Sequence, residues 1–122
     1  MRKFRIVSFK YAFSGLVIAL KEEPNLGIQA LIGFAGLLLA LYFKINQIEW
    51  LFSVIAFGLV FAAELINTAI EEVVNSFTEQ MHPAAKKAKD ISAAAVFVLF
   101  VTEAIVGLII FLPYLSKALS FA

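Results

Sequence analysis

The sequence contains no cysteine and only one histidine among its 122 residues. Without cysteine the chain has no disulfide, no thiolate ligand for a metal and no cysteine nucleophile, and the redox compartment cannot be read from it. Charged residues are also scarce, because Asp, Glu, Lys and Arg make up 16% of the chain. Ordinary soluble domains carry about 25% charged residues, so the composition excludes that class.

Familiar nucleotide-binding motifs are absent as well. The chain has no P-loop, no G-x-G-x-x-G motif, no internal repeat and no low-complexity tract. The usual glycine-rich phosphate cradles are therefore excluded. The net charge is only +1, and we expect no nucleic-acid partner.

Hydrophobic sequence makes up most of the chain. Hydrophobic residues account for 62% of the total, and the mean hydropathy is +0.94, which together indicate an integral membrane protein. The length is that of one domain, residues 1–122. Because a few membrane spans cannot enclose a sizeable cavity by themselves, we expect the chain to self-associate.

Residues 1–23 are predicted to form an amphipathic helix that lies along the membrane surface. Their apolar residues follow the i, i+4, i+7 and i+8 spacing of one helix face, and most of their lysines gather on the opposite face. Lys10 interrupts the apolar run and no small-residue cleavage pattern follows, which favours a retained helix over a signal peptide. Pro24 then changes the direction of the chain, since the residue before a proline is biased away from helix.

Three further stretches are long and apolar enough to cross a bilayer, namely residues 26–43, 50–75 and 84–113. The first covers about 27 Å as a helix, which is just enough for a hydrocarbon core of about 30 Å. The predicted fold is therefore an all-α integral membrane protein with one surface helix and three transmembrane helices. Glu103 is the one charge inside the last span. It can pair within an oligomer, face a crevice or be protonated, and we expect a charge there to be tolerated only if it faces protein.

Basic residues are divided unequally between the two sides of this predicted fold. Eight lysines and arginines flank the side that holds the N-terminus and the loop after the second span, against Lys44 and Lys117 on the other side. The positive-inside rule therefore predicts a cytoplasmic N-terminus and a C-terminus outside.

An unusual polar stripe runs along the second span near its cytoplasmic end. Glu64, Asn67 and Glu71 project from one helix face, because Glu71 falls only about 20° around the axis from Glu64. After the next loop come Lys89 and Asp90, in a cluster of basic residues. Magnesium prefers oxygen ligands and phosphates attract positive charge, so the combination is typical of a metal-phosphate site.

Other interpretations of these residues remain open at this point. The stripe can instead be a polar clamp between helices of an oligomer, as in a non-catalytic scaffold or a small pore. A pore is disfavoured because the second span has no charge between Trp50 and Ala63. Lys86 and Lys87 are best explained as a topology signal or a patch for anionic lipids.

Two motifs and their spacing are specific to one family. The chain contains E-L-x-N-x-A-I-E beginning at Glu64 and A-K-x-A-K-D ending at Asp90. With these motifs it resembles the small prokaryotic diacylglycerol kinase family over nearly its whole length. The segments SFKYAFSGL, KEE and INQIEWL are most similar to the undecaprenol kinase branch from Gram-positive bacteria.

The resemblance implies a homotrimer in the bacterial inner or plasma membrane, with active sites shared between neighbouring protomers. It implies an enzyme that transfers the γ-phosphoryl group of ATP to a lipid hydroxyl with the help of Mg²⁺. Undecaprenol is the expected acceptor, with diacylglycerol as the alternative.

The resemblance also implies roles for individual residues. Glu64 matches the general base, and Glu23 and Glu71 match the metal ligands. The residues that match nucleotide contacts are Tyr11, Glu23, Asn67, Glu71, Gln80, His82, Lys89 and Asp90. The chain departs from the family pattern at Pro24 to Gly27, at Asn75 and at Ala93.

Overall fold

The computed structural model describes residues 4–77 and 82–120, and this part of the chain is helical nearly throughout. Its elements are α1 (Phe4–Glu22), α2 (Pro24–Phe43), α3 (Gln47–Phe77) and α4 (Pro83–Ser120). Among the described residues, α2, α3 and α4 are long and apolar enough to cross a membrane. The prediction of an all-α chain with three such helices is confirmed, whereas the homotrimer stays a prediction.

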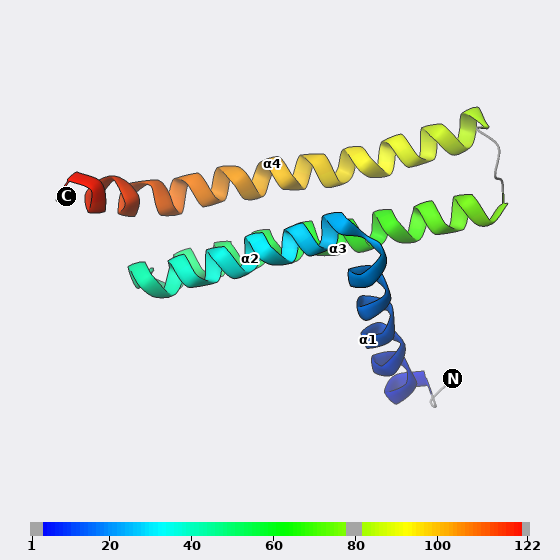
Figure 1. Ribbon diagram of the computed structural model, residues 1–122, viewed down its shortest axis with the longest axis horizontal. Helices are drawn as coiled ribbons and strands as arrows, with labels where there is room; N and C mark the ends of the chain where they lie inside the picture. The colour runs from blue at the N-terminus through cyan, green and yellow to red at the C-terminus, as the bar shows by residue number, and fades with distance from the viewer. Residues whose placement is uncertain (1–3, 78–81, 121–122) are drawn as a thin grey trace.

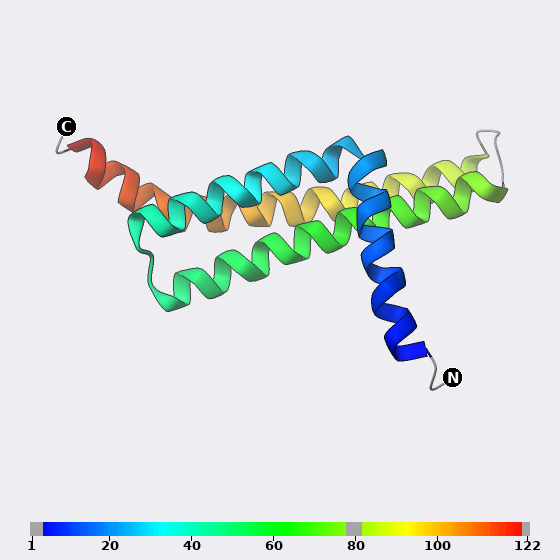
Figure 2. The ribbon, with the colours of Figure 1, turned by 60° about the horizontal axis from the view of Figure 1, so that its bottom comes forward.

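Three of the helices form an elongated bundle, and α1 projects away from it (Figures 1 and 2). The closest pair is α3 and α4, which pack against each other along the bundle, while α2 packs mainly on α3. Helix α1 contacts both α2 and α3 near its C-terminal end. The end of α1 is thereby placed beside the middle of the bundle.

The bend between α1 and α2 has a local cause at Glu23 and Pro24. Glu23 has an extended backbone, with φ −109° and ψ 108°, and Pro24 follows it at the start of α2. Proline suits the first turn of a helix because its missing N–H would be unsatisfied there in any case. Glu23 therefore stands at the junction of the two helices instead of inside either one.

The turn between α2 and α3 is built from two caps. Lys44 has a left-handed backbone with φ 51°, and its N–H donates to the carbonyl oxygen of Ala40. Asn46 Oδ1 then accepts from the N–H of Glu49 at 2.9 Å, while Glu49 Oε1 accepts from the N–H of Asn46 at 3.0 Å. This reciprocal capping satisfies two backbone donors that α3 would otherwise leave free.

A small apolar core closes the bundle at this end. It consists of buried Ala40, Ile45 and Ile110, with Phe43, Trp50, Val106, Phe111 and Tyr114 packed around them. Most other large apolar side chains on α2, α3 and α4 are exposed. Contiguous apolar surface on this scale is typical of a membrane-facing or partner-facing protein.

The last helix extends beyond the predicted span. The span over residues 84–113 stays a prediction, and the helix that contains it, α4, runs through Pro113 and ends at Ser120. A proline removes a single backbone hydrogen bond from a helix interior, and a long helix can continue past that interruption.

An apolar groove of about 760 Å³ lies between α2, α3 and α4, and Glu103 is the one charged residue in its lining. Glu103 Oε2 accepts a hydrogen bond of 2.7 Å from Nε2 of Gln29, which is buried on α2. The expectation that Glu103 faces protein is confirmed by this contact. The pair joins α2 to α4.

Candidate functional site

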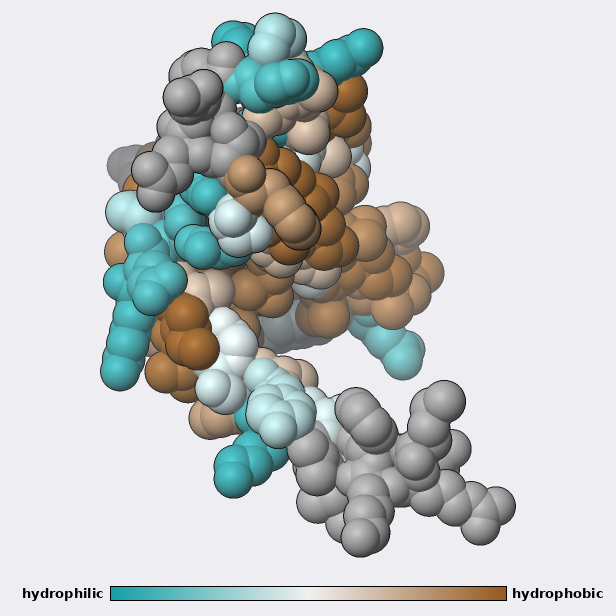
Figure 3. All heavy atoms as spheres, turned by 90° about the vertical axis from the view of Figure 1, so that its right-hand side faces the viewer, coloured by the Kyte–Doolittle hydropathy of each residue, from teal (hydrophilic) through white to brown (hydrophobic). Residues whose placement is uncertain are grey.

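Hydrophilic side chains gather at the end of the bundle where α3 ends and α4 begins (Figure 3). Hydrophobic side chains cover the bundle behind them. The predicted stripe lies near this end, on the second half of α3. Asn67 Nδ2 donates to Glu71 Oε1 at 3.3 Å, so the two side chains do share one face. Glu64 lies one turn earlier, and all three residues are partly buried.

Glu23, at the junction of α1 and α2, lies near enough to the stripe for its charge to act on Glu64. The negative charges of Glu23 and Glu71 both act on the carboxylate of Glu64. Among the described residues, no side chain donates a hydrogen bond to the Glu64 carboxylate. Negative charges that act on one another in this way attract a cation, because a cation would relieve their repulsion.

Helix α4 is tied to the stripe by Ser92, a residue that the sequence reasoning missed. Its hydroxyl lies 2.5 Å from Asn67 Oδ1, to which it donates, and 3.1 Å from the backbone carbonyl oxygen of Lys89. Ser92 is buried, with 8% of its surface exposed. Its only signal in the sequence is a polar residue three positions after Lys89, which places both on one side of a helix.

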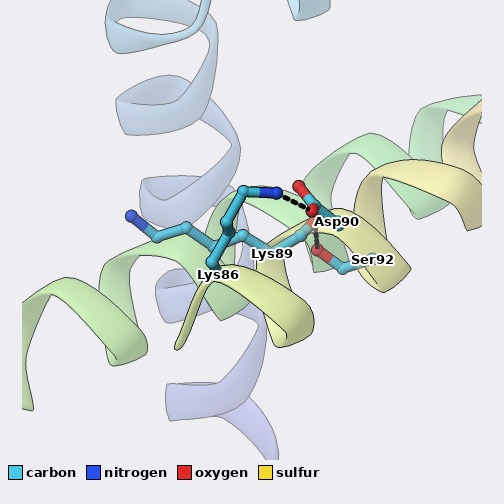
Figure 4. Close-up of polar contacts among 4 residues, drawn as sticks. All are labelled: Lys86, Lys89, Asp90 and Ser92. Carbon is cyan, nitrogen blue, oxygen red and sulfur yellow. Dashed lines mark hydrogen bonds and ion pairs between the residues drawn. The ribbon is translucent and has the colours of Figure 1, made fainter. Parts of the chain in front are cut away.

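Asp90 forms an ion pair with Lys86 at 2.5 Å in this structure (Figure 4), and its contact with nucleotide stays a prediction. Both side chains are exposed, and an exposed pair one helical turn apart contributes little stability. The ion pair can therefore be exchanged for contacts with a ligand. Lys89 is partly buried and its amino group points away from the pair.

Two of the residues predicted to contact nucleotide, Tyr11 and His82, form no hydrogen bond with the stripe within the described part of the chain, and a third lies outside that part. Tyr11 lies exposed on α1, roughly 18 Å along the helix from Glu23. His82 caps α4, because its Nδ1 accepts from the N–H of Ala84 at 3.1 Å. Gln80 lies outside the described residues. The helix-entry interpretation of His82, which competed with a ligand contact, therefore has a direct structural basis.

The residues of the stripe fit the ligand preferences of Mg²⁺. Within residues 4–77 and 82–120, no group of three or more His, Cys, Asp or Glu side chains is arranged to enclose a metal ion. Magnesium does not require such a cage, because it commonly takes one or two carboxylates and completes its shell with phosphate oxygens and water. Glu23 and Glu71 can supply the carboxylates.

Comparisons with known proteins identify the family of the chain. The profile of the family described as prokaryotic diacylglycerol kinase matches residues 10–111. An undecaprenol kinase of Bacillus subtilis is 40% identical over 108 residues, which cover 88% of each chain. A diacylglycerol kinase of Synechocystis sp. is 34% identical over 109 residues, covering 88% of this chain and 62% of the relative. A diacylglycerol kinase of Helicobacter pylori is 34% identical over 85 residues, or 70% of this chain and 66% of the relative. By the extent of these matches, the chain belongs to the prokaryotic diacylglycerol kinase family of lipid kinases.

Proposed function

We propose that this protein transfers the γ-phosphoryl group of ATP to the hydroxyl group of undecaprenol, in a reaction that requires Mg²⁺. The observation that carries the proposal is the surroundings of Glu64. Its carboxylate receives no side-chain hydrogen bond among the described residues and is flanked by the charges of Glu23 and Glu71. Such a carboxylate is suited to accept a proton, and its two neighbours are suited to bind a divalent cation.

In this proposal Glu64 is the general base. It accepts the proton of the lipid hydroxyl while the hydroxyl oxygen attacks the γ-phosphorus, and the bond from that phosphorus to the bridging oxygen of ADP breaks. An alcohol is a weak nucleophile, so a positioned base assists the reaction. ADP and the lipid phosphate are the products.

The remaining groups bind and orient the nucleotide. Glu23 and Glu71 would hold Mg²⁺, which when bound neutralises charge on the phosphates. Lys89 lies three residues before Ser92, which links α4 to the stripe and also contacts the backbone of Lys89. The amino group of Lys89 would pair with a phosphate oxygen. Positioning and charge neutralisation provide most of the rate enhancement in reactions of this class.

We propose the same homotrimer and orientation as the sequence indicated. Support for assembly comes from the large exposed apolar surface of α2, α3 and α4. The excess of basic residues on the site's side of the membrane supports a cytoplasmic active site, where ATP is present.

The choice of undecaprenol rests on the relative from Bacillus subtilis, whose identity to this chain is 40%. Diacylglycerol is the second candidate, because the relatives from Synechocystis and Helicobacter pylori are both named diacylglycerol kinase. The apolar lining of the groove between the helices accommodates either kind of hydrocarbon chain.

The test is transfer of labelled phosphate from ATP in the presence of Mg²⁺, with the purified protein in lipid and each acceptor offered separately. Glu64→Gln is expected to reduce transfer by at least about 100-fold, since it removes the base and keeps the side-chain shape. Glu72→Gln is the matched control, because Glu72 lies in the same helix and is exposed, and it should retain activity.

Faster transfer to undecaprenol supports the proposed acceptor, and faster transfer to diacylglycerol replaces it while leaving the mechanism in place. A folded protein that transfers phosphate to neither lipid would overturn the proposal. It would favour the alternative in which the stripe is a polar clamp of a non-catalytic oligomer.

A further inference from the structure

Three side chains form a continuous hydrogen-bonded chain from α4 to the end of the stripe. The Ser92 hydroxyl donates to Asn67 Oδ1 at 2.5 Å, and Asn67 Nδ2 donates to Glu71 Oε1 at 3.3 Å. Ser92 is the buried member of this chain, and the other two are partly buried. No other hydrogen bond to the Glu71 carboxylate occurs within the described part of the chain.

The chemistry of an amide explains what Ser92 does in this arrangement. An asparagine side chain has an oxygen that only accepts and a nitrogen that only donates. When the Ser92 hydroxyl donates to the oxygen, the nitrogen is left facing Glu71, where it can donate to the carboxylate. The reversed amide would turn its oxygen toward a negative charge. Ser92 thus supports the one orientation of Asn67 that holds Glu71.

Ser92 also links α4 to α3 at the stripe. Its hydroxyl lies within hydrogen-bonding distance of both Asn67 on α3 and the carbonyl oxygen of Lys89 on its own helix. This contact ties the segment that carries Lys89 to the same asparagine that contacts Glu71. The stripe on α3 and the segment of α4 that carries Lys89 are therefore joined by one buried hydroxyl group.

We propose that Ser92 is a positioning residue for phosphoryl transfer, which acts through Asn67 to keep the Glu71 carboxylate in place for a divalent cation. The proposal rests on the proposed function, since it takes Glu71 to be a metal ligand. Groups that hydrogen-bond the ligands of a metal commonly change its affinity by about 10- to 100-fold when they are removed.

The competing explanation is that Ser92 only fastens two helices together. Hydrogen bonds between membrane helices do contribute to stability, although modestly. The two explanations differ in one measurable respect. A fastening role changes the stability of the fold and leaves cation affinity unaltered, whereas a positioning role changes cation affinity in protein that is still folded.

The experiment measures Mn²⁺ binding to the purified, lipid-reconstituted protein by electron paramagnetic resonance, since Mn²⁺ takes the same oxygen ligands as Mg²⁺. Ser92→Ala is expected to weaken Mn²⁺ binding about tenfold and to raise the Mg²⁺ concentration at half-maximal rate to a similar degree. Ser92→Thr keeps the hydroxyl and should restore both. Thr102→Ala is the control, because the Thr102 hydroxyl bonds only to Val98 of its own helix.

A double-mutant cycle gives a second, independent criterion. If Ser92 acts through Glu71, adding Ser92→Ala to Glu71→Gln should weaken Mn²⁺ binding no further than Glu71→Gln alone. Additive losses would overturn the proposal. So would a Ser92→Ala protein that binds Mn²⁺ as tightly as the wild type and shows only a lower melting temperature.

Failure of this proposal is distinguishable from failure of the proposed function. A wild-type protein that transfers phosphate, with a Ser92→Ala variant of unchanged Mn²⁺ affinity, refutes the role of Ser92 alone. A wild-type protein that binds Mn²⁺ but transfers no phosphate refutes the kinase reaction. In that case a tenfold weaker affinity in Ser92→Ala would still support the role of Ser92 at the cation site.

Discussion

Glu49 and Glu64 lie on the same helix, and their surroundings are opposite. At the closed end of the bundle, the Glu49 carboxylate accepts hydrogen bonds from the backbone of Asn46 at 3.0 Å and from the hydroxyl of Tyr114 at 2.5 Å. At the other end, no side-chain donor to Glu64 occurs among the described residues, and its neighbours Glu23 and Glu71 are negatively charged. A satisfied carboxylate stabilises the fold, whereas an unsatisfied one is available to a ligand.

The two ends also differ in what holds the helices together. The closed end has a buried apolar core around Ala40, Ile45 and Ile110. The site end is joined across α3 and α4 by the hydrogen bond between Ser92 and Asn67. Substitutions at the closed end should therefore change stability alone, and substitutions at the site end should change activity as well.

The largest expected effect on stability is that of Gly33→Ala. A Cβ atom at Gly33 would lie 2.1 Å from Cε2 of Phe57, so the aromatic ring must move. We expect a loss of about 2 kcal/mol in the free energy of unfolding, measured by denaturant titration in detergent micelles. Gly36→Ala is the matched control on the same helix, since nothing lies within 4 Å of its added Cβ.

Gly33→Ala also tests whether the apolar contacts of the bundle affect stability without affecting activity. If the apolar contacts away from the stripe only support the fold, the rate of phosphate transfer per folded molecule should remain near the wild-type value. A variant that keeps its stability but loses transfer would show that the division of the bundle into a structural half and a functional half is wrong.

A smaller effect is expected at the pair of Gln29 and Glu103, which joins α2 to α4 between the two ends. Gln29→Leu removes the donor that lies 2.7 Å from Glu103 Oε2. Hydrogen bonds between membrane helices are worth about 0.6 kcal/mol on average, and the carboxylate left without its partner adds to the loss, so we expect about 1 kcal/mol.

The measurement is the same unfolding titration, with Glu103→Gln as the control for Gln29→Leu. The new amide still offers an oxygen to Gln29 and carries no charge, so its stability should be equal to that of the wild type or higher. Equal destabilisation by both variants would contradict the importance of the hydrogen bond. It would point to packing in the groove instead.

The smallest effect is expected for Tyr114→Phe at the closed end. The substitution removes the hydroxyl that donates to Glu49 and keeps the ring that stacks on Phe43, with ring centroids 5.5 Å apart. The melting temperature in detergent should fall slightly, since Glu49 keeps its contact with Asn46. Lipid phosphorylation should be unaltered. A loss of activity would show that the closed end and the site end of the bundle are coupled.

Several features of the fold and the site could be predicted from local sequence. The periodicity of apolar residues and the bias at Pro24 predicted helical segments and a change of direction, because both are properties of neighbouring residues. The spacing of Asn67 and Glu71 predicted their common face for the same reason. The continuation of α4 past Pro113 to Ser120 could not be predicted in this way, since a long helix can continue past one lost hydrogen bond.

The sequence by itself determined the membrane class, the helices and the stripe on α3, because hydropathy and helical spacing depend only on residues close together in the chain. Only the tertiary structure decided that Glu23 lies near Glu64, that Ser92 meets Asn67 and that Gln29 meets Glu103. These contacts depend on the register and rotation of one helix against another. Register and rotation arise from the packing of whole helix surfaces, which no single segment of sequence specifies.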